Sequence, residues 1–176
     1  MTGELLIRPS CDDDVAAITA IYGHHVLHGV ASFEEVPPSE AEMARRRAEI
    51  VGRGFPYVVG ERDGKIVGYC YTGPYRTRVG YRFSVEDSIY IDPSEVGRGI
   101  GRALLAEVIE RSTELGYRQM IAVIGGSETL PSIRLHAALG FAHIGVFTGI
   151  GFKFGRWIDS VYMQRPLGPG ASAPPG

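Results

Sequence analysis

Three glycines at alternate positions, Gly97, Gly99 and Gly101, stand between a run with strand periodicity and a run with helix periodicity. Glycine lets the backbone approach a ligand closely, and the first turn of a helix leaves its N–H groups without partners. The helix dipole strengthens the attraction of those groups for a negative charge. This order of strand, glycine-rich loop and helix therefore predicts a site for a phosphate-bearing ligand.

The spacing of the glycines excludes two familiar phosphate motifs. In the dinucleotide fingerprint G-x-G-x-x-G, the last glycine would fall on Arg102 or Leu104, depending on the starting glycine. The P-loop is absent because no glycine is followed by Lys and then by Ser or Thr. For the loop taken by itself, an ordinary glycine-rich turn into a helix is the alternative.

A carboxylate that could transfer a proton, Glu86, precedes this loop within the strand pattern. On strand alternation its side chain shares a face with Ser88 and Tyr90, and Asp87 lies on the other face. A carboxylate held beside an amine can remove a proton, which typically contributes about 10²–10⁴-fold to a rate. The alternative is a structural ion pair with Arg82 or another nearby cation, and the residues alone favour that pair.

Three arginines, Arg76, Arg78 and Arg82, lie with Tyr75 and Tyr81 in the segment just before the same strand. Guanidinium groups are well shaped to bind a carboxylate or phosphinate at two points. The cluster therefore indicates a site for an anionic substrate group. For any single arginine, a solvated basic loop is the simpler explanation.

The segments that must position these residues follow helix and strand periods. After the glycines, Leu104, Leu105, Val108 and Ile109 form the apolar stripe of a helix that ends at Gly116. Before the glycines, the expected elements are a strand over 5–9, a helix begun by the acids at 12–14 and running to about 26, and a helix over 40–51 capped by Ser39. Hairpin strands over 57–59 and 65–71, joined by Asp63 and Gly64, follow these helices. After the glycine-led helix, a buried strand over 119–124, a short helix from Pro131 and strands over 144–152 and 157–164 are expected.

This order of elements combines hairpins with two strand–helix–strand crossovers. It predicts an α/β (α+β) domain in which a mixed, mostly antiparallel central sheet is flanked by helices on both faces. The domain is expected to span residues 1–168. Residues 169–176 are rich in Pro, Gly, Ser and Ala, so they are expected to form a disordered tail.

Composition narrows the class of protein. In 176 residues, 44% are hydrophobic, 22% are charged and the formal net charge is −2, so no general attraction to nucleic acid or an anionic membrane is expected. Cys11 and Cys70 have no metal-ligand spacing and are expected to be buried free thiols in a reducing compartment. The same spacing predicts that no metal is bound. Since there is no signal segment and no apolar run of about 18 residues, a cytoplasmic protein is expected.

The glycine loop also fits the pattern Q/R-x-x-G-x-G/A, with Val96 in place of the usual Gln or Arg. This pattern resembles the pyrophosphate loop of the GNAT superfamily of N-acetyltransferases. Five further blocks are similar to the phosphinothricin acetyltransferase branch of that superfamily, over residues 84–88, 123–125, 132–136, 139–141 and 151–159. The resemblance covers about Ile7 to Leu167 and implies a single-domain GNAT fold.

The resemblance implies a reaction. Members of the branch transfer an acetyl group from acetyl-CoA to the α-amine of small amino-acid analogues such as phosphinothricin, methionine sulfoximine and methionine sulfone. The amine is expected to attack the thioester directly, with Glu86 as general base and backbone N–H groups stabilising the oxyanion. His136 lies where many members have a Tyr that protonates the leaving thiolate, and a purely structural histidine is an equal alternative.

The resemblance also implies the binding residues. Cofactor contacts are expected from the pyrophosphate loop, from the strand beside the pantetheine arm and from two polar residues near that arm: Val96, Gly97, Arg98, Gly99, Ile100, Gly101 and Arg102, then Ile89, Tyr90 and Ile91, then Thr129 and Ser132. Thr129 stands where the family often has Asn, which reaches further. Substrate contacts are expected from Phe33, Arg76, Arg78, Tyr81 and Lys153.

Two alternatives compete with this function. A different acceptor, such as a polyamine, an aminoglycoside or a protein N-terminus, would keep the chemistry, although the arginines near Arg76 argue against a cationic acceptor. A non-catalytic acyl-CoA sensor would be expected to have lost Glu86 or His136, and both are present. Since the branch commonly forms dimers, a homodimer is expected.

Overall fold

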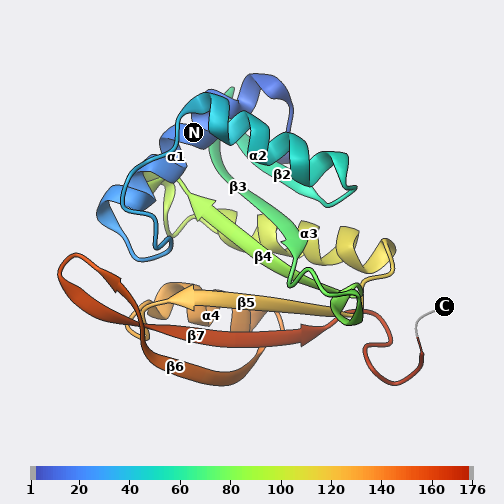
Figure 1. Ribbon diagram of the computed structural model, residues 1–176. Helices are drawn as coiled ribbons and strands as arrows, with labels where there is room; N and C mark the ends of the chain where they lie inside the picture. Colours follow the sequence, from blue (N-terminus) through green and yellow to red (C-terminus); the bar gives the residue numbers. More distant parts are fainter. Residues whose placement is uncertain (1–2, 175–176) are drawn as a thin grey trace.

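The computed structural model describes residues 3–174 and shows one seven-stranded sheet in the order β1-β2-β3-β4-β5-β7-β6 (Figure 1). The strands are β1 (Leu6–Pro9), β2 (Tyr57–Arg62), β3 (Lys65–Pro74), β4 (Ser84–Ile91), β5 (Gln119–Gly125), β6 (Ala142–Lys153) and β7 (Arg156–Pro166). The α-helices are α1 (Val15–His28), α2 (Glu40–Gly52), α3 (Ile100–Glu114) and α4 (Leu130–Ala138), and short 3₁₀ turns occupy Asp12–Asp14, Val79–Tyr81 and Pro93–Glu95.

The helices cover both faces of the sheet, as the sequence predicts. On one face α1 and α2 pack over a cluster that includes Ile18, Tyr69 and Tyr90. On the other face, the apolar stripe of α3, which includes Leu104 and Leu105, packs against the apolar side chains of β2 to β5. The predicted mixed α/β fold is confirmed. Of the two cysteines expected to be buried, Cys70 is buried in the core, whereas Cys11 is exposed just before the first helical turn.

All but one of the strand pairs are antiparallel. The exception is β4 with β5, which are joined by the crossover through α3 and pair in parallel. The second crossover, through α4, does not end beside β5, because β7 lies between β5 and β6. As a result β6 forms an edge of the sheet.

Local signals in the sequence account for several boundaries. Asp63 and Gly64 adopt positive φ values of 51° and 74° in the tight turn between β2 and β3, as the Asp-Gly pair predicts. The Ser39 hydroxyl accepts a hydrogen bond from the N–H of Glu42 at 3.2 Å, so the predicted cap of α2 is confirmed.

The acids before α1 lie where the sequence predicts them, with Asp14 at the N-cap position, but the side chain of Asp14 does not bond to that helix. Only 4% of Asp14 is exposed. Both terminal nitrogens of Arg8 instead donate to its carboxylate at 2.8 Å. A buried carboxylate needs a charged partner more than an exposed helix end needs a cap, which explains the difference.

The end of the chain is described as far as Pro174. Residues 169–173 form turns and bends, and Arg118 donates to the carbonyl oxygens of Gly170 at 3.3 Å and Pro174 at 3.2 Å. Residues 1, 2, 175 and 176 lie outside the described part, so the expected domain and tail boundaries stay predictions. No helix within residues 3–174 is long and apolar enough to cross a membrane.

Candidate active site

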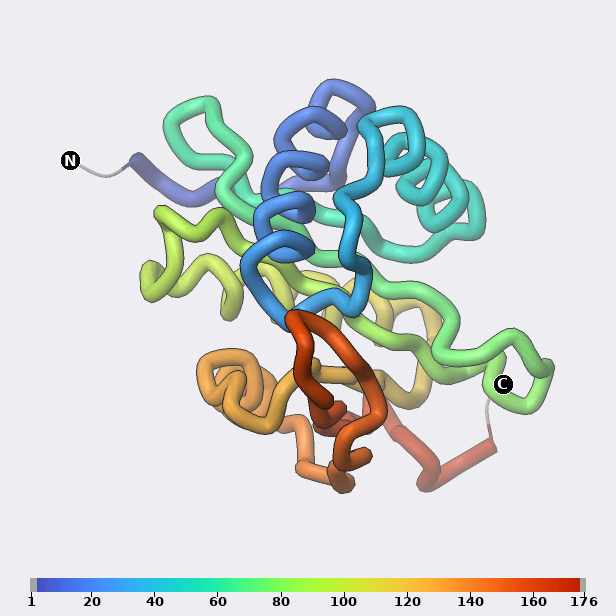
Figure 2. The backbone as a smooth tube through the Cα atoms, turned by 60° about the vertical axis from the view of Figure 1, so that its left-hand side comes forward, coloured from blue at the N-terminus to red at the C-terminus, as the bar shows by residue number. Residues whose placement is uncertain are grey.

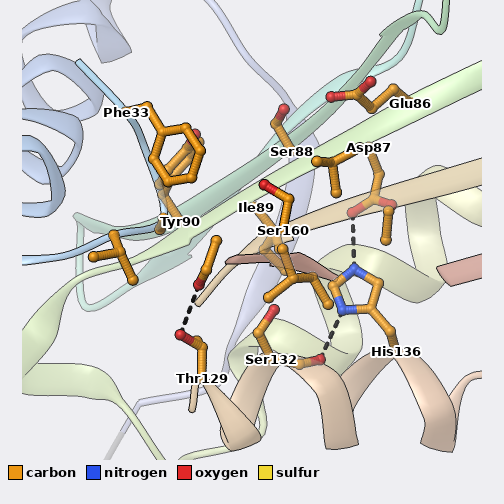
Figure 3. Close-up of a pocket in the computed structure, with 16 residues that line it drawn as sticks. Phe33, Glu86, Asp87, Ser88, Ile89, Tyr90, Thr129, Ser132, His136 and Ser160 are labelled. Atoms are coloured by element: carbon orange, nitrogen blue, oxygen red, sulfur yellow. Dashed lines mark hydrogen bonds and ion pairs between the residues drawn. The ribbon is translucent and has the colours of Figure 1, made fainter. Parts of the chain in front are cut away.

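The site lies where β4 and β5 part. The two strands pair from Ser84 with Gln119 to Asp87 with Ala122, and beyond that point β4 continues with β3 while β5 continues with β7. A cavity of about 240 Å³ opens in the gap (Figure 3). It is lined by β4, the end of β5, the start of α4 and the loop between α1 and α2: Val30, Ala31, Phe33, Glu86, Asp87, Ser88, Ile89, Tyr90, Ala122, Val123, Ile124, Gly125, Thr129, Ser132, His136 and Ser160.

Glu86 faces this cavity without a partner. No ion pair or side-chain hydrogen bond joins its carboxylate to any residue within 3–174, so the alternative of an ion pair with Arg82 is not what the structure shows. Burial raises the pKa of Glu86 to about 7, and the charge of Asp87 adds to the rise while Arg76 opposes it. A carboxylate with that pKa is suited to accept a proton near neutral pH.

Asp87 points to the other side of β4 and is bound to His136 (Figure 3). The distance from His136 Nε2 to Asp87 Oδ2 is 3.0 Å, and 2% of each side chain is exposed. Burial lowers the pKa of His136, but the hydrogen bond and charge of Asp87 outweigh burial, so the pKa is raised overall. The pair ties α4 to β4 beneath the cavity.

The second ring nitrogen of His136 is also occupied. Nδ1 lies 2.8 Å from the carbonyl oxygen of Ser132, which can only accept, so Nδ1 must carry a proton. Nε2 then faces a carboxylate oxygen, and one proton must lie between the two atoms. The arrangement is therefore an imidazolium–carboxylate pair or its neutral equivalent, and both ring nitrogens are held by the protein.

The glycine loop between β4 and α3 has the geometry of an anion site. Gly97 and Gly99 have φ values of 82° and 78°, which glycine adopts readily and other residues avoid. Among the hydrogen bonds of the described chain, none is donated by a backbone N–H of residues 97–102. These free N–H groups at the start of a fifteen-residue helix fit the diphosphate of a coenzyme.

The side chains around this loop have mixed positions. Val96 is 61% exposed, and Arg98 pairs with Glu95, which also binds Arg62. Ile100 is buried in the core and offers the loop only its backbone. The N–H groups of the loop, more than its side chains, are available to a ligand.

The other expected cofactor residues lie on both sides of the gap. Ile89 and Tyr90 line the cavity from β4, and Ile91 accepts a hydrogen bond from His25 Nε2 at 2.8 Å through its carbonyl oxygen. Thr129 and Ser132 line the cavity from the start of α4. The Thr129 hydroxyl donates to the carbonyl oxygen of Gly125 at 2.7 Å, which leaves it able only to accept from a ligand.

The arginine loop between β3 and β4 is exposed and carries free cations. Arg76 and Arg78 form no ion pair within the described residues, and Arg76 stacks 5.1 Å from the ring centroid of Tyr75. Tyr81 packs edge-on against Tyr75, with the ring centroids 5.6 Å apart. None of Arg76, Arg78 and Tyr81 lines the cavity, although the charge of Arg76 acts to lower the pKa of Glu86.

The remaining substrate residues, Phe33 and Lys153, differ in position. Phe33 lines the cavity above Tyr90 (Figure 3), and 41% of it is exposed. Lys153 does not line the cavity, and only 1% of it is exposed. Its ammonium group donates to the carbonyl oxygens of Gly29 and Ser32, in the loop that carries Phe33.

Sequence reasoning missed Asp87 and Ser160. Asp87 occupies a position where the strand pattern requires a buried side chain, and a buried acid needs a partner. That conflict was a usable signal for a structural pair. Ser160 carries no such signal, because β7 reaches the cavity only through its insertion beside β5.

No group of three or more His, Cys, Asp or Glu side chains within residues 3–174 is placed to hold a metal ion. The site instead offers backbone N–H groups, which donate hydrogen bonds, and the carboxylate of Glu86, which accepts them and has no partner within residues 3–174. This set suits a coenzyme thioester and an amine.

The chain matches the acetyltransferase (GNAT) domain family over residues 7–162, and it therefore belongs to that family. It is 53% identical over 169 residues to a phosphinothricin N-acetyltransferase of Alcaligenes faecalis, covering 96% of this chain and 86% of the relative. It is 38% identical over 166 residues to an L-methionine sulfoximine/L-methionine sulfone acetyltransferase of Salmonella typhimurium, covering 93% and 95% of the two chains.

A solved structure supports the same assignment. The crystal structure of a GNAT superfamily phosphinothricin acetyltransferase from Sinorhizobium meliloti, in complex with AcCoA, superposes with a TM-score of 0.95 at 52% identity. The match covers 98% of this chain and 93% of that chain. The resemblance expected from the sequence motifs is thus confirmed.

Proposed function

We propose that this protein transfers the acetyl group of acetyl-CoA to the α-amine of a small amino-acid analogue of the phosphinothricin or methionine sulfoximine type. The observation that carries the proposal is the unpaired Glu86 carboxylate in the gap between β4 and β5, on the strand that leads into a loop of free N–H groups. The activities named for the relatives with 53% and 38% identity support the same reaction.

Each part of the site has a role in this reaction. The N–H groups of residues 97–102 hold the diphosphate, and the edge of β4 beyond Asp87 borders the pantetheine arm. Acetyl-CoA supplies an activated carbonyl carbon. Glu86 accepts the proton that the ammonium group of the acceptor loses, and the free amine then attacks the carbonyl carbon. The new C–N bond replaces the C–S bond, and the CoA thiolate leaves and takes up the second proton, which the attacking nitrogen loses. N–H groups along the free edge of β4 stabilise the charge that develops on the carbonyl oxygen.

The arginine loop favours an anionic acceptor. Arg76 and Arg78 are exposed and unpaired within the described residues, and guanidinium groups bind carboxylates and phosphinates at two points. A polyamine or an aminoglycoside would be repelled by the same charges. The acceptor group bound there is therefore the carboxylate or the tetrahedral oxygen group of the amino-acid analogue.

His136 supports the reaction as a positioning residue. Its two ring nitrogens bind Asp87 and the carbonyl oxygen of Ser132, so neither is free for the departing thiolate unless a bond is broken. Through these bonds His136 holds α4, with Ser132 and Thr129, against β4. We assign it this role in place of general acid.

The function is tested by measuring the release of the CoA thiol from acetyl-CoA with a panel of acceptors. The panel contains phosphinothricin, methionine sulfoximine, methionine sulfone, ordinary amino acids, spermidine and an aminoglycoside. Turnover confined to the analogues, and lost in Glu86→Gln, is expected. Turnover on spermidine would overturn the acceptor class, and tight CoA binding without turnover on any acceptor would favour the sensor.

We also propose that the protein forms a homodimer. Its location is proposed to be the cytoplasm. Six large apolar side chains on the edge strand β6 and the start of β7 are between 41% and 68% exposed: Ile144, Val146, Phe147, Ile150, Phe152 and Trp157. An exposed apolar patch on an edge strand is typical of an interface. Analytical ultracentrifugation is expected to give a dimer, and a monomer at high concentration would contradict it.

A further inference from the structure

A buried ammonium group links two segments that are far apart in the sequence. Lys153 Nζ donates to the carbonyl oxygens of Gly29 at 2.9 Å and Ser32 at 2.7 Å, and the residue is 1% exposed. Both acceptors lie in the loop between α1 and α2, more than 120 residues away in sequence. Figure 2 shows this loop, in blue, meeting the tip of the β6–β7 hairpin, in red. A lysine is rarely buried unless the structure uses its charge.

The two-residue turn after Lys153, Phe154 and Gly155, has positive φ at both positions and places an aromatic ring near the ammonium group. Phe154 has a φ of 52°, a conformation that bulky residues avoid, and its ring centroid lies 4.9 Å from Lys153 Nζ. Strained backbone persists only where the surroundings stabilise it. The third face of the ammonium group thus meets an aromatic ring, and its other two hydrogen-bond directions meet the loop carbonyls.

Two glycines allow the loop to lie close to the sheet. A Cβ atom added at Gly151 would overlap the ring of Phe33, and one added at Gly125 would overlap the carbonyl oxygen of Val30. Gly151 lies two residues before Lys153 on the same strand. Contact and charge therefore hold the loop against the hairpin at the same place.

The opposite side of the loop is held by a second set of bonds. The Tyr22 hydroxyl lies 2.8 Å from Ser32 Oγ and donates to Glu34 at 3.0 Å. Arg46 also donates to Glu34, at 2.6 Å. The loop is thus bound to α1 and α2 on one side and to Lys153 on the other.

Between these two attachments the loop forms one wall of the active-site cavity. Val30, Ala31 and Phe33 line it. We propose that Lys153 is a positioning residue, which holds this wall in place and so sets how tightly the acceptor is bound and how well it is discriminated. This proposal rests on the proposed acetyltransferase activity, and it assigns to Lys153 a role different from direct contact with the substrate.

The chain offers a matched control, because Lys65 and Lys153 are its only lysines. Lys65 is exposed at the start of β3. The test compares three variants. Lys153→Met keeps the unbranched apolar part of the side chain but lacks the ammonium group, Lys153→Arg can still donate, and Lys65→Met is the control. KM and kcat are measured for the acceptor and for acetyl-CoA, together with the melting temperature.

In Lys153→Met the acceptor KM is expected to rise about tenfold to hundredfold, since misplacing a binding wall by about 1 Å costs that much. The KM for acetyl-CoA should stay within about twofold, because its diphosphate loop does not touch the wall, and preference among amino-acid acceptors should weaken. Lys153→Arg should lose less acceptor binding than Lys153→Met. Lys65→Met should show none of these effects. An unchanged acceptor KM, or a fall in kcat and melting temperature without a change in either KM, would overturn the proposal.

A labelling measurement tests the contact without relying on activity. Intact wild-type protein is treated with acetic anhydride at low concentration, and modification of the two lysines is followed by mass spectrometry. Lys65 is expected to react at least about a hundredfold faster than Lys153, since local opening limits access to a buried group. Equal modification rates for Lys65 and Lys153 would overturn the contact, and this result does not depend on whether the variants fold. If the wild-type enzyme shows no turnover but Lys153 is protected, the proposed function is rejected and the contact stands.

Discussion

Glu86 and Asp87 are neighbouring carboxylates on β4 that face opposite sides of the strand. Glu86 lines the cavity, and its carboxylate forms no hydrogen bond or ion pair within the described chain. Its pKa is raised to about 7, chiefly by burial. Asp87 faces α4, where it binds His136 at 3.0 Å. The same chemical group thus serves as a proton acceptor on one face and as a structural anchor on the other.

The difference between the two carboxylates comes from their partners. A buried pair of titratable groups satisfies both members, and loss of either partner leaves the other buried without compensation. A partly buried carboxylate without a partner holds its proton more tightly and can exchange it near neutral pH. Substitutions at the two positions should therefore separate activity from stability.

The largest expected effect is on the activity of Glu86→Gln. Loss of the proton acceptor should lower kcat by about 10²–10⁴-fold while the melting temperature does not fall. Steady-state kinetics with phosphinothricin and thermal unfolding measure the two quantities. The exposed Glu110→Gln serves as control and should match the wild type. A variant that keeps more than half of wild-type kcat would rule out Glu86 as the base.

Asp87→Asn should destabilise the fold by about 3–5 kcal/mol, because it leaves His136 buried without its charged partner. The pKa of His136 is raised in the folded state, so the stabilisation is full below the ordinary value of 6.5 and declines as the pH rises through the raised value. Urea unfolding should therefore show a larger loss at pH 6 than at pH 9.

The control for this second prediction is Asp13→Asn, because Asp13 is exposed. It should leave the free energy of unfolding within about 0.5 kcal/mol of the wild type. If Asp87→Asn behaves in the same way as this control, the pair with His136 is not an anchor and the contrast between the two faces fails.

The pH dependence of the wild-type enzyme should report Glu86. Because the carboxylate must be ionised to accept a proton, kcat/KM is expected to rise about tenfold per pH unit below its pKa of about 7 and to level off above it. The residual activity of Glu86→Gln should lack this rise. An unchanged rise in the variant would assign the titration to another group.

The smallest expected effect is a gain in stability for Glu86→Gln. The pKa of Glu86 is raised in the folded state, so ionisation costs stability; the cost is absent below the ordinary value of 4.5 and complete above about 7. Allowing for screening of a partly exposed group, the variant should be more stable by about 1 kcal/mol at pH 8. At pH 4 it should equal the wild type in urea unfolding, and a loss of stability at pH 8 would show that Glu86 has a stabilising partner.

The sequence by itself determined the elements that depend on neighbouring residues. Alternation over β4, the glycines before α3 and the apolar stripe of that helix are local patterns, and they correctly predicted the loop with free N–H groups. Strand alternation likewise places Glu86 and Asp87 on opposite faces of β4, as the structure shows. Local chemistry is sufficient there because every contributing atom belongs to one stretch of about twenty residues.

Only the tertiary structure decided which distant residues meet. The Asp87–His136 pair spans 49 residues, and the contact of Lys153 with Ser32 spans 121. Neither contact leaves a periodic signal, because one depends on how α4 packs against β4 and the other on how the β6–β7 hairpin reaches the loop after α1. Whether a charged side chain serves chemistry or architecture depends on what is packed against it, and that is a property of the folded chain.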